Sequence, residues 1–309
     1  MASGVRIGIV MPVHNGEPWL GSTLDSLVDQ RDPSLEVVIR DSTAGAGCRS
    51  IIDGYRDRLA IDYLHCPQVK SWTAKTNDAA RSATATHLCI LHQDDLWLFG
   101  RLAVARQLIA RHPSAALICN PSYLVDAGGR ILGQWRPPLR TGEVDRALLL
   151  ERLIVQNFIS MPSPVIRRDQ WLAVGGLDEA LWYTPDWDLY LKLARRGSVV
   201  YDPRPTTAFR LHGGSLPLTG DRQEFADQLA LVLERHSAAV SPAASRIGRA
   251  SVKINTLLAD AAAGNWRALV KAFATVLGLG PGNAARYLRY SRILERTLPR
   301  LRLRLAGRL

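Results

Sequence analysis

The sequence predicts an α/β fold with a mostly parallel central sheet flanked by helices, followed by a C-terminal helical extension. Short apolar runs alternate with amphipathic helical patterns over the first 120 residues, which is typical of a parallel sheet covered on both faces. The 309 residues are 47% hydrophobic and 22% charged, so the chain can bury a sizeable core. Beyond residue 220 the pattern is helical, and we divide the chain into an α/β domain, 1–220, and a helical extension, 221–309.

The first elements follow from local hydrophobic patterns. The apolar run at 5–13 predicts a buried strand that ends at Pro12 and the turn after it. Apolar residues at helical spacing predict a helix over 17–30, which ends before Asp32-Pro33. Later strands are expected at 35–40, 61–64, 87–91 and 115–120, and helices at 48–59, 74–83 and 101–111.

The second half of the chain is less regular until residue 185. There Pro185 opens an amphipathic pattern, which predicts a helix with proline in its first turn. In the extension, prolines and glycines predict where one helix ends and the next begins. We expect these breaks at Pro242, at Gly280-Pro281 and at Pro299.

The cysteines and the N-terminal segment indicate a cytoplasmic protein. None of the four cysteines forms a C-x-x-C pair, and Cys89 and Cys119 sit in apolar runs, so we expect buried thiols in a reducing compartment. The first residues lack a basic segment followed by an apolar segment of signal length. A peripheral position on the inner face of the cell membrane stays open.

The net charge of +11 is concentrated at the C-terminal end. Residues 286–309 carry eight arginines and one glutamate, and the rest of the chain carries about +4. Leucines at 294, 298, 301 and 305 fall on one helical face of this tail, which suits contact with an acidic membrane. A merely solvated basic end is an equal alternative. Specific nucleic-acid binding is not expected, because few aromatic residues interleave with the arginines.

Polar side chains follow three predicted strands at the point where each strand ends. His14 and Asn15 follow the first strand, Asp41 follows the second, and Asp94-Asp95 follow the strand at 87–91. In parallel sheets, ligands bind beyond the carboxyl ends of the strands. We therefore expect these side chains to form one site.

Asp94 and Asp95 predict a divalent cation. Two adjacent carboxylates are costly to hold close unless positive charge lies nearby, and Mg²⁺ or Mn²⁺ accepts carboxylate oxygens while leaving positions for phosphates. The alternative is a solvated turn in which Asp95 caps the following helix. Asp41 could accept hydrogen bonds from a base or ribose, or could cap a turn.

Two later segments offer further polar groups. Asp186 and Asp188 lie in the first turn of the helix that opens at Pro185, where they either stabilise the helix dipole or supply a general base. His212 precedes a glycine pair and could complete a metal site, and Arg210 could balance a diphosphate. No dinucleotide fingerprint, P-loop or serine-nucleophile elbow occurs in the sequence.

Taken in order, these stretches resemble the family 2 inverting glycosyltransferases with the GT-A fold. The start, Met11 to Glu17, resembles their P-V-Y-N-G-E segment with histidine in place of tyrosine, and Val37 to Thr43 resembles V-V-D-D-G-S-T with Arg40 in place of the first acid. The later matches, which extend to about residue 215, are Lys75-Thr76-Asn77 for A-R-N-x-G, Leu91 to Asp95 for L-D-x-D-D, Gly175 to Glu179 for G-G-F-D-E, Pro185 to Leu189 for E-D-x-D-L, and Arg210-Leu211-His212 for R-x-H.

The resemblance implies roles for individual residues. Asp186 takes the position of the catalytic base, and Asp94, Asp95 and His212 take those of the ligands to Mg²⁺ or Mn²⁺. The nucleotide-sugar contacts that it implies are Pro12, Val13, His14, Asn15, Glu17, Asp41, Lys75, Asn77, Asp94 and Arg210.

The function that the resemblance implies is transfer of a hexose from a UDP-, dTDP- or GDP-linked donor, in enzyme class EC 2.4, with inversion. The acceptor would be a hydroxyl of a glycan or lipid-linked glycan, as in membrane-associated synthesis of cell-envelope polysaccharide. One alternative is a metal-dependent nucleotide or phosphoester hydrolase that uses the same acid pair. Another is a non-enzymatic protein that binds anionic surfaces through its arginine-rich tail.

Overall fold

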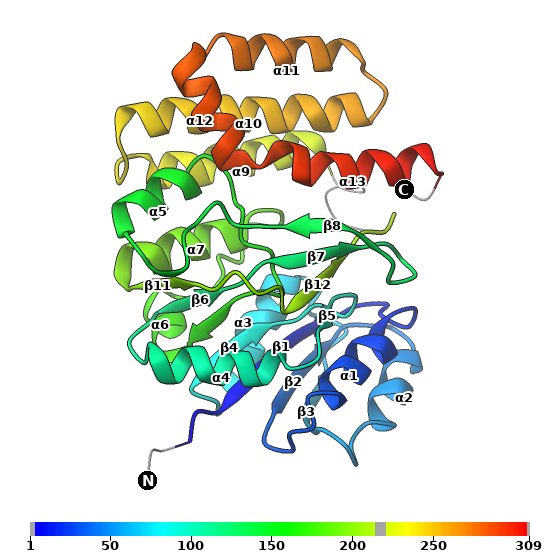
Figure 1. The fold of residues 1–309 in the computed structure, drawn as a ribbon. Helices are drawn as coiled ribbons and strands as arrows, with labels where there is room; N and C mark the ends of the chain where they lie inside the picture. Colours follow the sequence, from blue (N-terminus) through cyan, green and yellow to red (C-terminus); the bar gives the residue numbers. More distant parts are fainter. Residues whose placement is uncertain (1–3, 214–220, 308–309) are drawn as a thin grey trace.

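The structure is a computed structural model that describes residues 4–213 and 221–307. It has an eight-stranded sheet, a four-stranded sheet and a stack of helices above them (Figure 1). The predicted boundary at residue 220 falls at the edge of the undescribed segment 214–220, and the division into two domains stays a prediction.

The large sheet confirms the predicted α/β fold. Its strands β3, β2, β1 and β4 are parallel, β6 and β11 are parallel, and β10 and β9 each run antiparallel to their neighbours. The strands lie in the order β3 (Ala60–His65), β2 (Glu36–Asp41), β1 (Ile7–Val13), β4 (His87–Ile90), β10 (Val165–Arg167), β6 (Leu117–Cys119), β11 (Val199–Tyr201) and β9 (Gly142–Val144).

Helices cover both faces of this sheet, because its central strands are apolar on both sides. Every residue of β1 is buried, with Ile9 and Met11 in one hydrophobic cluster and Val10 in the other. The first cluster includes residues of α1 (Leu20–Val28), α2 (Gly47–Asp53) and α4 (Arg101–Arg111). The second includes residues of α3 (Trp72–Ser82), α5 (Arg146–Leu153), α6 (Arg168–Ala173) and α7 (Pro185–Arg196). All four cysteines are buried free thiols, as predicted for Cys89 and Cys119.

The small sheet was not predicted from the sequence. Its strands lie in the order β5 (Leu96–Trp97), β12 (Thr207–Arg210), β7 (Ser122–Val125) and β8 (Ile131–Trp135). In the antiparallel β5–β12 pair, Thr207 lies opposite Trp97 and Ala208 opposite Leu96. This pairing brings the segment just after β12 beside the segment just before β5.

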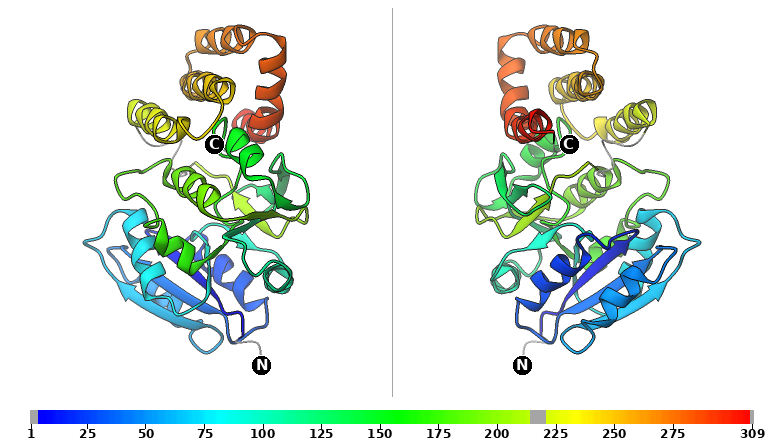
Figure 2. Two further views of the ribbon diagram at one scale, coloured as in Figure 1. Left: turned by 90° about the vertical axis from the view of Figure 1, so that its left-hand side faces the viewer. Right: turned by 90° about the vertical axis from the view of Figure 1, so that its right-hand side faces the viewer.

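The extension is helical, as predicted. It consists of α9 (Arg222–Ser237), α10 (Pro242–Ala262), α11 (Arg267–Leu277), α12 (Pro281–Ser291) and α13 (Ile293–Leu305), and Figure 2 shows how they stack. The breaks at Pro242 and Gly280-Pro281 are confirmed. Among the described residues, no helix combines the length and apolar character needed to cross a membrane.

The predicted break at Pro299 is wrong. Pro299 lies inside α13, and the break comes earlier, at Arg292, whose backbone is left-handed with φ of 49°. Proline removes one helical hydrogen bond, and packing compensates for that loss here. Pro299 is buried and its ring lies against Gly133 of β8, and Leu303 packs with Leu124 and Leu211.

Candidate active site

The carboxyl ends of β1, β2 and β4 are tied together by hydrogen bonds between the segments that follow them. The backbone N–H of His14 donates to Gln93 Oε1 at 2.7 Å, and Gln93 Nε2 donates back to the His14 carbonyl at 2.9 Å. The Asn15 N–H donates to Thr43 Oγ1 at 2.9 Å. The three strand ends therefore form one rigid edge, as the sequence predicted, and exposed His14, Asn15 and Glu17 lie along it.

Asp41 is fully buried at this edge, and both of its carboxylate oxygens accept hydrogen bonds. Oδ1 accepts from the Thr43 N–H at 2.8 Å, and Oδ2 accepts from the Tyr63 hydroxyl at 3.1 Å. Burial and the neighbouring Asp41 charge raise the pKa of Tyr63. Asp41 thus fixes the β2 turn and aligns Tyr63, and its contact with a nucleoside stays a prediction.

Lys75 reaches the same edge from α3. Its Nζ donates to the Val13 carbonyl at 2.6 Å and to Ser42 Oγ at 2.7 Å, and the residue is only 1% exposed. Burial lowers the pKa of Lys75 to about 8. The ammonium group thus lies beside the ends of β1 and β2, and its contact with a nucleotide sugar stays a prediction.

Asn77 is committed to a different contact. Its Nδ2 donates to the Leu177 carbonyl at 2.8 Å and to Glu179 Oε1 at 2.9 Å, and its Oδ1 accepts from the Leu177 N–H. Gly176 fits tightly here, with φ of 70° and no room for a side chain, since a Cβ would lie 2.5 Å from Asn77 Oδ1. Asn77 therefore pins the glycine-pair loop to α3. Its predicted contact with the nucleotide sugar is untested.

Asp94 and His212 meet directly, although they are 118 residues apart in the sequence. His212 Nε2 lies 2.8 Å from Asp94 Oδ2. Burial raises the pKa of Asp94, but the hydrogen bond to His212 and the neighbouring His92 lower it more, so the pKa stays below its usual range. The His212 ring packs on Trp19, with 4.1 Å between ring centroids.

Asp95 and Arg210 connect the segment that bears Asp94 to the segment that bears His212. Asp95 is almost fully buried, and its Oδ1 accepts from the Arg210 N–H at 3.0 Å. Burial and the neighbouring Asp94 raise the pKa of Asp95 well above its usual range. Arg210 Nε donates to the Asp94 carbonyl at 2.7 Å and Nη1 donates to the Ala127 carbonyl at 2.8 Å. The predicted contact of Arg210 with a diphosphate stays a prediction.

The acid pair and His212 fit a divalent cation in part. Within 4–213 and 221–307, no three or more His, Cys, Asp or Glu side chains gather into a metal site. Asp94 and His212 do come together, and one carboxylate plus one imidazole suits Mn²⁺ or Mg²⁺ when substrate phosphates and water complete the coordination. The protein residues alone supply two of the three predicted ligands at one point.

Asp186 lies half-buried at the start of α7. Its Oδ2 accepts from Asn157 Nδ2 at 2.7 Å, and its Oδ1 accepts from the Trp187 N–H at 2.8 Å. Burial raises the pKa of Asp186 to about 6, and these two hydrogen bonds limit the rise. A carboxylate with a pKa near 6 is suited to accept a proton at neutral pH.

Replacing Asn157 by alanine is expected to shift the pH dependence of catalysis. The hydrogen bond from Asn157 stabilises the ionised carboxylate of Asp186, so its loss raises the pKa of that group further. Because the base form is the active one, the ascending limb of kcat/KM should move from near pH 6 to higher pH. A pH–rate profile measures the shift, and an unchanged limb with a uniformly lower rate would assign Asn157 a purely structural role.

Asp188, two residues further along α7, has different partners from Asp186. It is fully buried, its Oδ1 lies 2.9 Å from His236 Nε2 of α9, and its Oδ2 lies 2.5 Å from Lys192 Nζ. Burial raises the pKa of Asp188, but the contacts with His236 and Lys192 lower it more, so the pKa falls below its usual range. Asp188 therefore joins the α/β part to the helical extension, while Asp186 faces Asn157.

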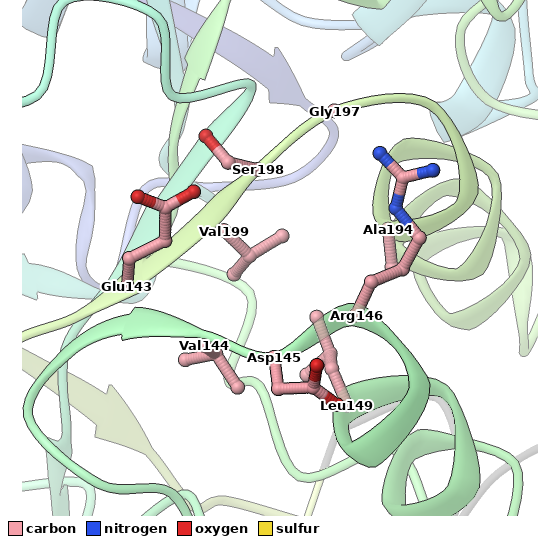
Figure 3. A pocket seen from close by; sticks show the side chains of 9 residues that line it. All are labelled: Glu143, Val144, Asp145, Arg146, Leu149, Ala194, Gly197, Ser198 and Val199. Carbon is pink, nitrogen blue, oxygen red and sulfur yellow. The ribbon is translucent and has the colours of Figure 1, made fainter.

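A separate cavity of about 370 Å³ lies between α5, α7 and the β9–β11 pair (Figure 3). Glu143, Arg146 and Ser198 are among its lining residues. None of the predicted site residues lines it. The strand-end edge and the start of α7 remain the candidate active site.

Sequence reasoning did not single out Asn157, Gln93, Trp19 or His236. One signal was present for Asn157, which lies with Gln156 and Ser160 in a segment, 153–161, whose other residues are apolar. Gln93 lies between His92 and the acid pair, but its role depends on the backbone of a distant strand end. Trp19 and His236 give no local signal, since each meets its partner only through tertiary packing.

Comparisons with known proteins relate the chain to glycosyltransferases. The family described as Glycosyl transferase family 2 matches residues 8–161. An uncharacterized glycosyltransferase of Haemophilus influenzae is 25% identical over 203 residues, which cover 62% of this chain and 63% of the relative. One from Rickettsia typhi is 24% identical over 211 residues, which cover 67% of this chain and 64% of the relative. The chain thus spans less than two thirds of the length of either relative.

Two solved structures share the fold. Staphylococcus aureus TarS 1–349 in complex with UDP-GlcNAc superposes with a TM-score of 0.63 at 17% identity, covering 82% of this chain and 81% of TarS. The mannosyltransferase PcManGT of Pyrobaculum calidifontis, in complex with GDP-Man and Mn²⁺, superposes with a TM-score of 0.57 at 18% identity, covering 94% and 86%. The predicted GT-A-type fold is confirmed, and together with the family match over residues 8–161 it supports a family 2 glycosyltransferase.

Proposed function

We propose that the protein transfers a sugar from a UDP-, dTDP- or GDP-linked donor to an acceptor hydroxyl, with inversion at the anomeric carbon. The observation that carries the proposal is Asp186, a half-buried carboxylate at the start of a helix, held by Asn157 and with a pKa raised to about 6. This is the state that a general base needs near neutral pH.

The chemical step is a single displacement. The Asp186 carboxylate takes the proton of the acceptor hydroxyl as its oxygen forms a bond to the anomeric carbon. The bond from that carbon to the diphosphate oxygen breaks on the opposite face, so the configuration inverts. Transfer then leaves Asp186 protonated and releases a nucleoside diphosphate.

The strand-end edge supplies the donor contacts in this proposal. Asp41 and Lys75 would hold the nucleoside and phosphates, since an acid and a cation lie side by side at the ends of β1 and β2. The other donor contacts are the residues that the resemblance assigns, namely Pro12, Val13, His14, Asn15, Glu17, Asn77, Asp94 and Arg210.

A divalent cation fits the Asp94–His212 pair. Asp94 and His212 would hold Mg²⁺ or Mn²⁺ with Asp95 close behind them. When bound, the ion supplies positive charge to offset the charge that develops on the departing diphosphate. PcManGT was solved with GDP-Man and Mn²⁺, and TarS with UDP-GlcNAc, which supports this donor class.

The acceptor in this proposal is a hydroxyl of a glycan or a lipid-linked glycan on the cytoplasmic side of the cell membrane. A metal-dependent hydrolase would use the same residues without an acceptor. The two activities differ in one measurable respect, because a hydrolase releases free sugar at its full rate when no acceptor is present, whereas a transferase requires one.

Nucleotide binding tests the proposal. A thermal-shift panel of UDP, dTDP, GDP, ADP and CDP, each with and without Mn²⁺, should show a rise in Tm for one nucleotide, and a larger rise with metal. Asp94→Ala should remove the metal-dependent part of the shift and retain the rest. A flat panel, with every nucleotide within error of buffer, would contradict the proposed donor class.

A further inference from the structure

One face of α11 is apolar and exposed along its whole length. Its large side chains are between 52% and 67% exposed, in contrast to the buried residues of the same helix. They recur at spacings of three and four residues, which places them on one side of the helix. The apolar face of α11 consists of Trp266, Leu269, Val270, Phe273 and Leu277.

This face points away from the rest of the chain. The opposite side of α11 packs on α10 through buried Ala268 and Ala272. In both views α11 is the outermost helix of the stack, on the far side of α10 from the sheets (Figures 1 and 2). Exposed apolar patches of this kind are unusual on a soluble surface and mark contact sites.

The segment that carries the apolar face is basic, and two of its cations, Arg267 and Lys271, lie on α11 itself. Residues 264–307 contain nine lysines and arginines and one acid, Glu295. Six of the basic residues are exposed in the structure: Arg267, Lys271, Arg286, Arg289, Arg302 and Arg304. The positive charge near the apolar face indicates which kind of partner can bind there. A second copy of the chain would bring positive elements against positive elements, whereas an anionic surface is attracted.

We infer that α11 lies in the surface of a lipid bilayer rich in anionic lipid. The apolar face enters the boundary between headgroups and acyl chains, and Arg267 and Lys271 of the same helix meet the lipid phosphates. Trp266 at the start of the helix suits this depth, because the amphipathic indole ring favours the interface.

The membrane contact inferred for α11 differs in place from the one predicted for the tail, 286–309. The tail leucines at 294, 298 and 301 are exposed as that prediction requires, but the longest apolar face lies outside 286–309, on α11. The side chain of Leu305 lies outside the described residues. The inference does not depend on the proposed transferase activity, so either can fail without the other.

Vesicle co-sedimentation of the full chain tests the inference. The protein should pellet with vesicles of 70% phosphatidylcholine and 30% phosphatidylglycerol, and only weakly with phosphatidylcholine alone. The double variant Leu269→Gln/Phe273→Gln should lower the partition coefficient at least about tenfold, since two apolar side chains leave the acyl region. Raising NaCl from 0.1 to 0.5 M should weaken binding through screening.

A matched control uses two exposed apolar residues elsewhere on the chain. Phe99→Gln/Leu172→Gln removes a comparable pair at positions that are 80% and 44% exposed, and should bind the vesicles as the parent protein does. The nucleotide-induced thermal shift should be the same for all three proteins. Three results would overturn the inference. The parent protein does not bind anionic vesicles, or both double variants bind them equally well, or the α11 double variant loses a concentration-dependent dimer while its vesicle binding is unchanged.

Discussion

Asp186→Asn is expected to lower kcat for sugar transfer by about 10³-fold, a loss typical of removing a general base. The amide keeps an acceptor for the Trp187 N–H but cannot take a proton from the acceptor hydroxyl. The donor contacts lie on other elements, so nucleotide affinity should change by no more than about twofold. Product formation with a saturating acceptor measures kcat, and calorimetric titration with the nucleoside diphosphate measures Kd.

The stability of this variant separates a chemical loss from a folding defect. Because the pKa of Asp186 is raised in the folded state, the ionised carboxylate destabilises the fold increasingly as pH rises from about 4 through 6. Asp186→Asn should therefore unfold at or above the Tm of the parent protein at pH 8. Asp169→Asn, an exposed acid on α6, is the matched control and should retain full activity. If Asp186→Asn weakened nucleotide affinity by the same factor as it lowered kcat, the assignment of Asp186 as the base would be refuted.

The elements that could be predicted from the sequence are those whose stability is local. α4 begins and ends at the predicted residues, since its apolar spacing and the glycine before it are contained in one segment. β1 was predicted because a fully buried strand is a continuous apolar run. The small sheet gives no such signal. β5 has two residues, and it becomes a strand only by pairing with β12, more than 100 residues later.

The site divides in the same way. The strand-end positions of Asp41 and Asp94 follow from the parallel sheet, because the chain must place the ends of β2 and β4 at one edge. The Asp94–His212 contact could be predicted only from the resemblance, since the small sheet that creates it has no sequence signature. The roles of Asn157 and Asn77 could not be predicted from the sequence. Amides pair with whatever tertiary packing brings near, so their partners could not be read from neighbouring residues.

Asp188→Ala is expected to lower the free energy of unfolding by about 3 kcal/mol, the cost of removing one partner from a buried charge pair. The carboxylate is fully buried, and its loss leaves His236 of α9 without this acceptor and Lys192 without its counter-charge. Urea unfolding followed by tryptophan fluorescence measures the change. Asp188→Asn keeps an acceptor for His236 and should cost less, and Asp53→Ala, an exposed acid paired with Arg56, should leave the urea midpoint unchanged.

The pH dependence of this loss identifies its origin. Because contacts with His236 and Lys192 lower the pKa of Asp188 below its usual value, its stabilising contribution is complete above about pH 4 and is lost as pH falls through the lower folded value. The difference between the parent protein and Asp188→Ala should therefore shrink as pH falls from about 4 to about 3. A difference that stays constant across this range would mean that packing, and not the charge, joins α7 to α9. In that case Asp188 would contribute through the volume of its side chain, and its ion pair with His236 of α9 would add no stability.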